Sequence, residues 1–358
     1  MTIKNDDWSN DNSQCPGFWI STPREILIYI ANNINQGEIK CITNSAGNRP
    51  VWSITYGSKG KKLGTSNFSA AKGSGNINSF LGTDANKKNP VVMIVGGTHG
   101  AEMEGVVGII NLLSILETGK DLLGTEWPYL EEIKKKVRII LIPLLNPDGR
   151  NRVKPGSLVG MSFEKFRYWA QGQWKNGELI GYPDCKKYQP LPLDKVKFMG
   201  GYPNDDGINL MHDVSLSGLK ARETKAYFST LEKERPDCVC LLHSHEGGPT
   251  VLGPDSLLPE PHQDIQWKIK QKLYQVMKAK NMRPGEISNY NNSIKRPLFN
   301  MSTASYATSG TVPFVFEGPH GLSDNMFSHE EILKIQLTLY KLLFENVLKI
   351  PINSSELN

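Results

Sequence analysis

Residues 91–102, VVMIVGGTHGAE, decide the fold class of this 358-residue chain. Their first seven positions form a near-continuous apolar run, which is typical of a strand covered on both faces of a sheet. The chain then turns on glycines, and His99 and Glu102 follow three residues apart, so both side chains can point at one metal ion. An imidazole nitrogen and a carboxylate oxygen are ligands that hydrolytic zinc sites use. The spacing alone is a weak indication, because His243 and Glu246 repeat it and a histidine hydrogen-bonded at a strand end fits equally well.

Helical and strand patterns alternate along the chain around this stretch. Apolar periodicity and capping residues predict helices over residues 23–34, 106–116, 218–234, 265–280 and 328–344. Strands are predicted over residues 49–56, 91–97, 137–145, 238–242 and 311–316, of which 91–97 and 137–145 are apolar enough to be buried. This alternation favours a single α/β domain with a mixed, mostly parallel sheet and helices on both faces. We assign this domain to residues 17–350 and expect residues 1–16 to be a flexible arm.

Two stretches break the pattern. Residues 57–89 are rich in Gly, Ser, Asn and Lys and are predicted to be surface loop. Residues 151–208 have weak periodicity and many aromatic residues, and a connection of this length is uncommon unless it forms a lid or a binding loop. We predict a long active-site loop here, although its aromatic side chains can also simply close the rim of the sheet.

The overall composition excludes several classes of protein. Apolar residues make up 39% of the chain, and its net charge of +5 is spread over short basic runs without interleaved aromatic residues. These runs indicate solvated faces, so we expect no nucleic-acid partner. The five cysteines include no C-x-x-C pair, which argues against a cysteine zinc site. A polar start and the lack of an apolar stretch of about 20 residues predict a cytoplasmic protein with no membrane partner.

Three predicted strands end in side chains that can carry chemistry. The first supplies His99 and Glu102, the second His243 and His245, and the third Glu317. Because open α/β sheets place their chemistry at the carboxyl ends of strands, we expect these groups to converge. His99, Glu102 and His243 would give the three protein ligands of a catalytic zinc ion. Glu317 would move the proton as general base and acid, since burial beside an apolar strand raises the pKa of a carboxyl group.

The same pieces occur in the order found in a known family. They are His99-Gly100-Ala101-Glu102, Asn146-Pro147-Asp148-Gly149, Leu242-His243-Ser244-His245 and Phe316-Glu317. Through them, residues 20–345 resemble the zinc metallocarboxypeptidases of the carboxypeptidase A-like superfamily. The resemblance implies a Zn²⁺ cofactor and a sheet of about eight strands. It also implies that His99, Glu102 and His243 are the zinc ligands and that Glu317 is the general base and acid.

The resemblance further predicts residues that contact the substrate. In the family, an arginine after the Asn-Pro-Asp-Gly turn polarises the carbonyl of the scissile bond. Arg150, Arg152 and Arg167 follow the turn here, and Arg152 and Arg167 are our candidates. Tyr306 stands where the family has a pocket tyrosine, and Tyr290 is the candidate for the tyrosine that covers the substrate.

One departure concerns the Asn-Arg pair with which the family grips a terminal carboxylate. In the matching stretch, residues 207–213, Met211 and His212 occupy the two places. His212 could hold a carboxylate only weakly or when protonated. The predicted substrate-binding residues are Asn209, His212, His245 and Tyr306, and His245 has two alternatives, as a residue that supports a metal ligand or as a residue at the rim of the site.

Several functions stay open on the sequence. A zinc hydrolase could cleave a peptide or an acyl-amino acid, or act as an amidase or deacylase on a small conjugate or a cell-wall peptide fragment. A non-catalytic zinc-binding or ligand-binding protein on the same fold is the alternative of another class. An amidohydrolase barrel built on His243 and His245 is disfavoured, because this pair lies too late in the chain. The oligomeric state is not determined by any of these features.

Overall fold

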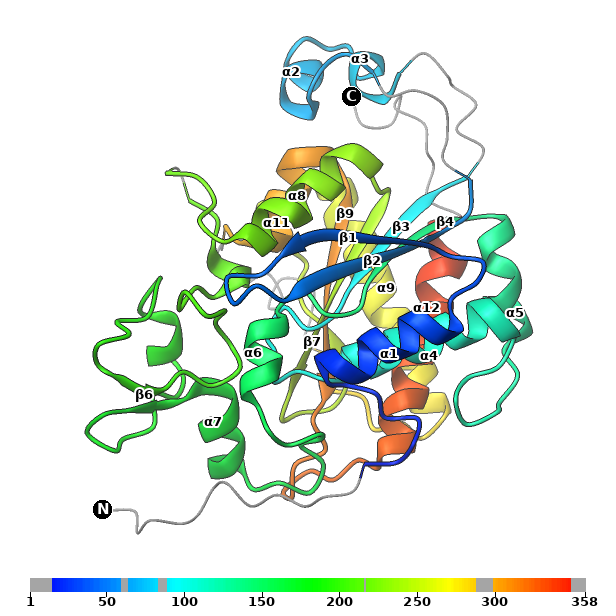
Figure 1. Ribbon diagram of the computed structural model, residues 1–358. Coiled ribbons are helices and arrows are strands. Elements are labelled where there is room, and N and C mark those ends of the chain that lie inside the picture. Colours follow the sequence, from blue (N-terminus) through cyan, green and yellow to red (C-terminus); the bar gives the residue numbers. More distant parts are fainter. Residues whose placement is uncertain (1–14, 59–63, 83–88, 216, 288–298, 349–358) are drawn as a thin grey trace.

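The computed structural model describes residues 15–58, 64–82, 89–215, 217–287 and 299–348, and Figure 1 shows how their elements are arranged. The helices are α1 (Pro23–Asn33), α2 (Phe68–Gly73), α3 (Asn78–Leu81), α4 (Glu104–Thr118), α5 (Pro128–Glu132), α6 (Pro147–Arg152), α7 (Phe163–Gln171), α8 (Arg222–Glu234), α9 (Glu260–Ala279), α11 (Met301–Ser309) and α12 (His329–Val347). Short 3-10 helices are η1 (Ile133–Lys135), η2 (Asp184–Lys186) and η3 (Leu210–His212). The strands are β1 (Glu38–Asn44), β2 (Pro50–Tyr56), β3 (Val91–Val95), β4 (Arg138–Ile142), β5 (Gln173–Trp174), β6 (Val196–Phe198), β7 (Cys238–His245), β8 (Thr250–Val251) and β9 (Val312–Pro319).

The main sheet has seven strands among the described residues, in the order β1-β2-β4-β3-β7-β9-β8. The central strands β4, β3, β7 and β9 are parallel, while the pairings of β1 with β2, β2 with β4 and β8 with β9 are antiparallel. Helices cover both faces, with α1, α4 and α12 on one side and α8 and α11 on the other (Figure 1). The predicted mixed, mostly parallel sheet is confirmed, with seven described strands where the resemblance implied about eight.

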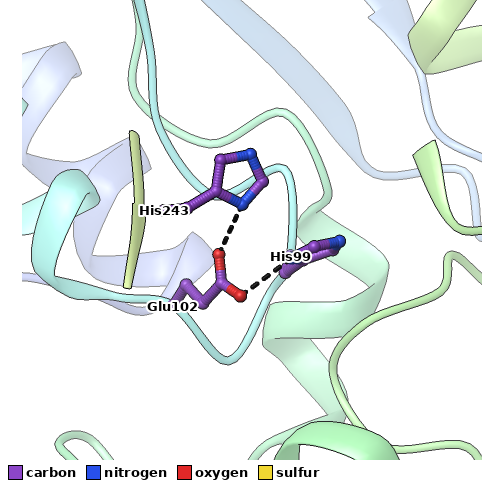
Figure 2. A group of neighbouring side chains, drawn as sticks. All are labelled: His99, Glu102 and His243. Atoms are coloured by element: carbon purple, nitrogen blue, oxygen red, sulfur yellow. Dashed lines mark hydrogen bonds and ion pairs between the residues drawn. The ribbon is translucent and has the colours of Figure 1, made fainter. Parts of the chain in front are cut away.

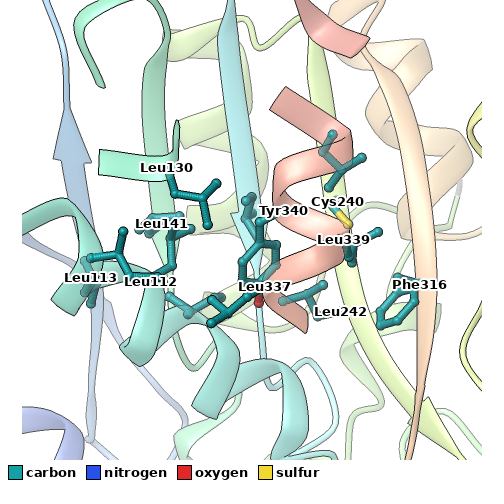
Figure 3. Packing of buried hydrophobic residues seen from close by; sticks show 14 of the residues in the cluster. Leu112, Leu113, Leu130, Leu141, Cys240, Leu242, Phe316, Leu337, Leu339 and Tyr340 are labelled. Atoms are coloured by element: carbon teal, nitrogen blue, oxygen red, sulfur yellow. The ribbon is translucent and has the colours of Figure 1, made fainter. Parts of the chain in front are cut away.

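Strand β3 explains why the sheet forms the middle layer. All five of its residues are buried, with Val92 and Ile94 in one apolar cluster and Met93 and Val95 in the other. The first cluster includes the long apolar helices α4 and α12, and Figure 3 shows its packing against the sheet. Full burial of a Val, Leu or Ile side chain contributes about 1.5–3 kcal/mol, so the strand is held firmly from both faces.

The long predicted helices are observed within a few residues of their expected ends. Thr22 and Ser328 both cap their helices in complete capping boxes, each accepting a hydrogen bond from the backbone of a glutamate three residues later. Among the described residues, no helix combines the length and the apolar character that crossing a bilayer requires.

The short elements are where prediction and structure differ. Helices α2 and α3 lie in the stretch 57–89 that was expected to be loop; Asn67 caps α2, and Phe68 packs against Phe80. The long loop 151–208 contains α7, η2 and the small sheet β5–β6. Strands β1 and β8 also escaped prediction, since β1 is mostly exposed and β8 has two residues. Residues 1–14 of the expected arm, and Tyr290, lie outside the described residues.

The carboxyl ends of β3, β7 and β9 lie at one edge of the sheet, because these strands are parallel neighbours. The loop after β3 packs tightly on the start of α6, where a Cβ on Gly100 would lie 2.0 Å from the backbone nitrogen of Arg150. Only glycine fits so close an approach. The backbone nitrogen of Gly100 also donates to the carbonyl oxygen of Gly201 at 2.7 Å, which joins the long loop to this edge.

Candidate metal centre and active site

Three buried side chains meet at this edge of the sheet (Figure 2). His99 comes from the loop after β3, Glu102 from the residues just before α4, and His243 from β7. The two carboxylate oxygens of Glu102 lie 2.8 Å from Nδ1 of His99 and 2.8 Å from Nδ1 of His243. The candidate ligand atoms lie within 4.8 Å of one another, and each residue is at most 5% exposed. The structure therefore brings together the three residues that were predicted as zinc ligands.

The hydrogen bonds of His99 fit a cation in this cluster. Its Nε2 lies 3.0 Å from Oδ1 of Asn209, an atom that only accepts, so Nε2 carries the proton and Nδ1 presents a lone pair. Nδ1 and a Glu102 oxygen are then two acceptors 2.8 Å apart, an arrangement that requires a proton or a cation between them. Two imidazoles and one carboxylate are a donor set of catalytic zinc sites, and the residues present fit Zn²⁺.

Charges within the cluster favour ionised Glu102. Burial by itself raises the pKa of this carboxyl group, but His99 and His243 outweigh burial and hold the pKa well below its ordinary value. Burial lowers the pKa of His243, and the attraction of Glu102 overcomes this effect and raises the pKa on balance. An ionised carboxylate is the form that binds a metal ion.

Glu317 stands beside the cluster because of strand register. It pairs directly with His243 across the parallel strands β9 and β7. Side chains at paired positions of neighbouring strands lie on the same face of a sheet. Burial raises the pKa of Glu317 to about 7, with His243 opposing the rise and Glu102 adding to it. A carboxyl group that titrates near neutral pH can both accept a proton and return it.

Two residues near the end of the long loop hold the ring of His99. Tyr202 stacks on it with ring centroids 4.2 Å apart and planes 11° from parallel. Oδ1 of Asn209 accepts from His99 and also from the backbone nitrogen of Met211 at 3.1 Å, which identifies this atom as the oxygen. Histidines that bind metals usually donate their second N–H to such an acceptor, which fixes the orientation of the ring. The structure thus places Asn209, predicted to bind substrate, behind a candidate metal ligand.

The arginines after the Asn-Pro-Asp-Gly turn lie in different surroundings. Arg150 is 1% exposed and donates to three backbone carbonyl oxygens of neighbouring segments. Arg152 donates to three backbone carbonyl oxygens and pairs with Asp205. The guanidinium of Arg167 lies against Gly181 in the long loop. The role of polarising a carbonyl stays a prediction, which the contacts of Arg152 do not support.

Met211 and His212 belong to η3, which follows Asn209. Met211 is buried and offers no charge. Burial lowers the pKa of His212 to about 4, and the positive charge of Lys186 acts in the same direction. His212 is therefore neutral at neutral pH and can hold a carboxylate by charge only in acid.

His245 and Tyr306 have contacts of their own. Nε2 of His245 lies 2.9 Å from the carbonyl oxygen of Gly248, so this ring closes the turn after β7. Tyr306 in α11 packs its ring against Phe68 and His262, with centroids 5.6 Å and 4.9 Å away. The structure keeps His245 at the end of β7 and places Tyr306 in a separate aromatic cluster.

The sequence alone does not single out Lys186 or Tyr202. Lys186 ends η2 inside the long loop, and its positive charge acts on the pKa values of His212, His243 and Glu317. Tyr202 is one of many aromatic residues in that loop. No spacing connects either residue to the metal cluster, because the loop returns to it through irregular structure.

Residues 30–192 match the model of a protein family described as zinc carboxypeptidase. The match includes His99, Glu102 and the Asn-Pro-Asp-Gly turn, and it ends before His243 and Glu317. A search of the curated proteins finds no matching sequence.

Solved structures share the fold over most of the chain. A metallo-carboxypeptidase from Burkholderia cenocepacia is 14% identical, with 91% of this chain and 69% of that chain covered and a TM-score of 0.59. A carboxypeptidase A from Helicoverpa armigera is 13% identical, with 96% and 78% covered and a TM-score of 0.57. A metallo-carboxypeptidase from Pseudomonas aeruginosa, solved with (2-guanidinoethylmercapto)succinic acid, is 10% identical, with 91% and 69% covered and a TM-score of 0.54. At these identities the likeness shows a common fold.

Proposed function

We propose that this chain, whose residues 30–192 match the zinc carboxypeptidase family model, hydrolyses peptide or amide bonds in a zinc-dependent reaction. The proposed metal ligands are His99, Glu102 and His243, and the proposed general base is Glu317. The observation that carries this proposal is the register of β7 and β9, which sets Glu317 beside a buried His-Glu-His cluster. Zinc bound there would supply a Lewis acid that polarises a carbonyl group and lowers the pKa of water toward neutral pH.

The chain's own residues would position the ligands and move the proton. Asn209 and Tyr202 hold the ring of His99 so that Nδ1 faces the cluster. Glu317 takes a proton from the attacking water and returns it to the nitrogen of the leaving amine. A C–O bond forms as the C–N bond breaks, so the products are a carboxylic acid and an amine.

Glu317→Gln tests the proposed base. The variant should bind zinc in the same stoichiometry as the wild type and lose hydrolysis by about 10²–10⁴-fold, the usual contribution of a general base. Glu246→Gln, which changes an exposed glutamate in the turn after β7, is the matched control and should keep full activity. Retained turnover in Glu317→Gln would remove Glu317 as the base. Bound zinc in the wild type without hydrolysis of any amide would favour the non-catalytic alternative.

A carboxypeptidase and an amidase or deacylase differ in whether the substrate must have a free, negatively charged carboxylate. Buried Met211 and neutral His212 favour an amidase or deacylase that needs no free carboxylate on its substrate. Lys186 favours a carboxypeptidase, because its side chain is exposed and its positive charge is among those that act on His243 and Glu317. We propose Lys186 as the group that attracts an anionic substrate when the substrate has a free carboxylate.

Paired substrates decide between these functions. A peptide with a free C-terminal carboxylate and its C-terminal amide are compared on wild type, Lys186→Met and, as the matched control, the neighbouring exposed Lys187→Met. A carboxypeptidase should prefer the acid, and Lys186→Met should raise KM for the acid alone. Equal hydrolysis of both substrates by all three proteins would support the amidase or deacylase.

A further inference from the structure

A buried carboxylate–imidazole pair connects the two halves of the proposed site. Glu104 is the first residue of α4 and lies two positions after Glu102. His320 directly follows β9 and lies three positions after Glu317. Nδ1 of His320 is 3.0 Å from Oε1 of Glu104, and both side chains are fully buried. We propose that Glu104 and His320 are positioning residues that fix the metal ligand Glu102 relative to the base Glu317, an inference that rests on the proposed function.

Each end of this pair is attached to an element that carries the site. The backbone nitrogen of His320 donates to the carbonyl oxygen of His245 at 2.9 Å, which ties the end of β9 to the end of β7. The ring of His320 also packs against Phe166 of α7, with centroids 4.8 Å apart. Glu104 lies in the first turn of α4, where the helix dipole favours a carboxylate. The pair therefore joins the starting turn of α4 to the ends of two strands.

The residue types of this pair indicate that it orients the site and adds little to the stability of the fold. Burying a carboxylate and an imidazole is costly, and well-packed apolar residues of similar volume often stabilise a fold equally or better. In the described part of the chain, Oε2 of Glu104 and Nε2 of His320 have no hydrogen-bond partner, so the pair does not recover its full desolvation cost from protein groups. Unlike apolar residues, the pair forms a directional hydrogen bond. This bond fixes the position of the start of α4 relative to the end of β9.

The test replaces the pair by apolar residues in the full-length protein. Glu104→Met/His320→Leu removes both partners of the pair together, so neither is left buried without the other, and the variant should fold with a Tm close to that of the wild type. We expect zinc affinity and kcat each to fall by about 10–100-fold, as for other groups that support metal ligands, with little change in KM. A folded double variant with the zinc affinity and kcat of the wild type would overturn the proposal.

Two further variants complete the test. His262→Leu changes another buried histidine, which contacts the carbonyl oxygen of Gly310 away from the site, and should alter Tm but leave zinc affinity and kcat unchanged. If the double variant does not fold, Glu104→Gln decides, since it keeps the oxygen acceptor and removes the charge. Weaker zinc binding by Glu104→Gln supports the positioning role, and unchanged binding overturns it.

Zinc affinity keeps this test separate from the proposed function. It is measured by competition with a chelator of known affinity and needs no substrate. If the wild type binds zinc and hydrolyses nothing, the proposed function fails, while the zinc affinities of wild type and double variant still decide whether the pair positions Glu102.

Discussion

Strand β7 passes from the apolar core into the candidate active site, and its two halves differ in how their buried groups are satisfied. Cys240 and Leu242 are fully buried and pack with α4 and α12 (Figure 3). His243 and Ser244 are buried as well, yet Nε2 of His243 and Oγ of Ser244 have no protein partner among the described residues. A buried polar atom without a partner costs about 1–3 kcal/mol. The apolar core therefore stabilises the fold, and part of that stability offsets the cost of burying these polar groups beside the candidate metal centre.

Removing zinc should have the largest effect, because it should destabilise the active-site half of β7 and leave the packing of the apolar core unchanged. Zinc at 1,000 times its Kd adds about 4 kcal/mol to the free energy of unfolding, and chelation removes this contribution. Urea unfolding with zinc and with chelator measures it. His243→Ala should show almost no zinc-dependent change, because it lacks a proposed ligand. A full zinc-dependent gain in His243→Ala would contradict the assignment of this residue.

Leu113→Ala should lower the stability of the apolar core and leave the activity of the candidate site unchanged. Leu113 in α4 is fully buried in the apolar cluster, and its truncation should lower the free energy of unfolding by about 3 kcal/mol through lost burial and a cavity. The value of kcat/KM, measured where the variant is folded, should equal that of the wild type. Leu27→Ala, at a position 43% exposed, is the control and should cost far less. A large fall in kcat/KM of Leu113→Ala would show that the geometry of the candidate active site depends on packing in the apolar core.

Arg152→Met should separate a structural arginine from a catalytic one. The change removes the donors that hold three loop carbonyl oxygens and Asp205, so we expect a loss of about 2 kcal/mol in unfolding free energy. Hydrolysis should fall mainly through the mobility of the loop that carries Tyr202. Wild-type stability combined with a kcat reduced by more than about 100-fold would instead support the sequence-based prediction that Arg152 polarises the carbonyl.

The smallest expected effect concerns His262, a buried histidine outside the edge. Burial lowers its pKa below the ordinary value of 6.5, so the unfolded chain takes up a proton more readily than the folded one. Stability should therefore fall as the pH drops through 6.5. Unfolding free energies at neutral and acidic pH should differ more in the wild type than in His262→Asn. An identical pH dependence in both proteins would exclude this contribution.

Much of the architecture could be predicted because it depends on local patterns. The apolar run of β3, the capping boxes at Thr22 and Ser328, and the long amphipathic helices are all set by neighbouring residues. The clustering of His99 and Glu102 with His243 follows from one further rule, that parallel strands bring their carboxyl ends to the same edge. Short elements such as α2 and β8 carry too few residues for a pattern.

The residues that contact and support the candidate metal ligands could not be predicted in the same way. The amide of Asn209 contacts His99 across 110 residues, and His320 contacts Glu104 across 216. Each of these contacts depends on the path of irregular loops, which no periodicity describes. The two arginines Arg150 and Arg152 show the same limit, since only the folded loops reveal that their donors are already in use.

The order of the strands and the residue types that a zinc hydrolase needs could be read from the sequence, whereas β7 and β9 extend to His245 and Pro319, beyond their predicted ends at 242 and 316. Hydrophobic periodicity and capping are local, so they are readable without coordinates. Which groups face one another depends on the tertiary structure: Asn209 lies behind His99, Glu317 is in register with His243, and Glu104 lies against His320. These pairings arise from strand register and from loops returning over long chain separations, where the positions of both partners depend on the whole fold.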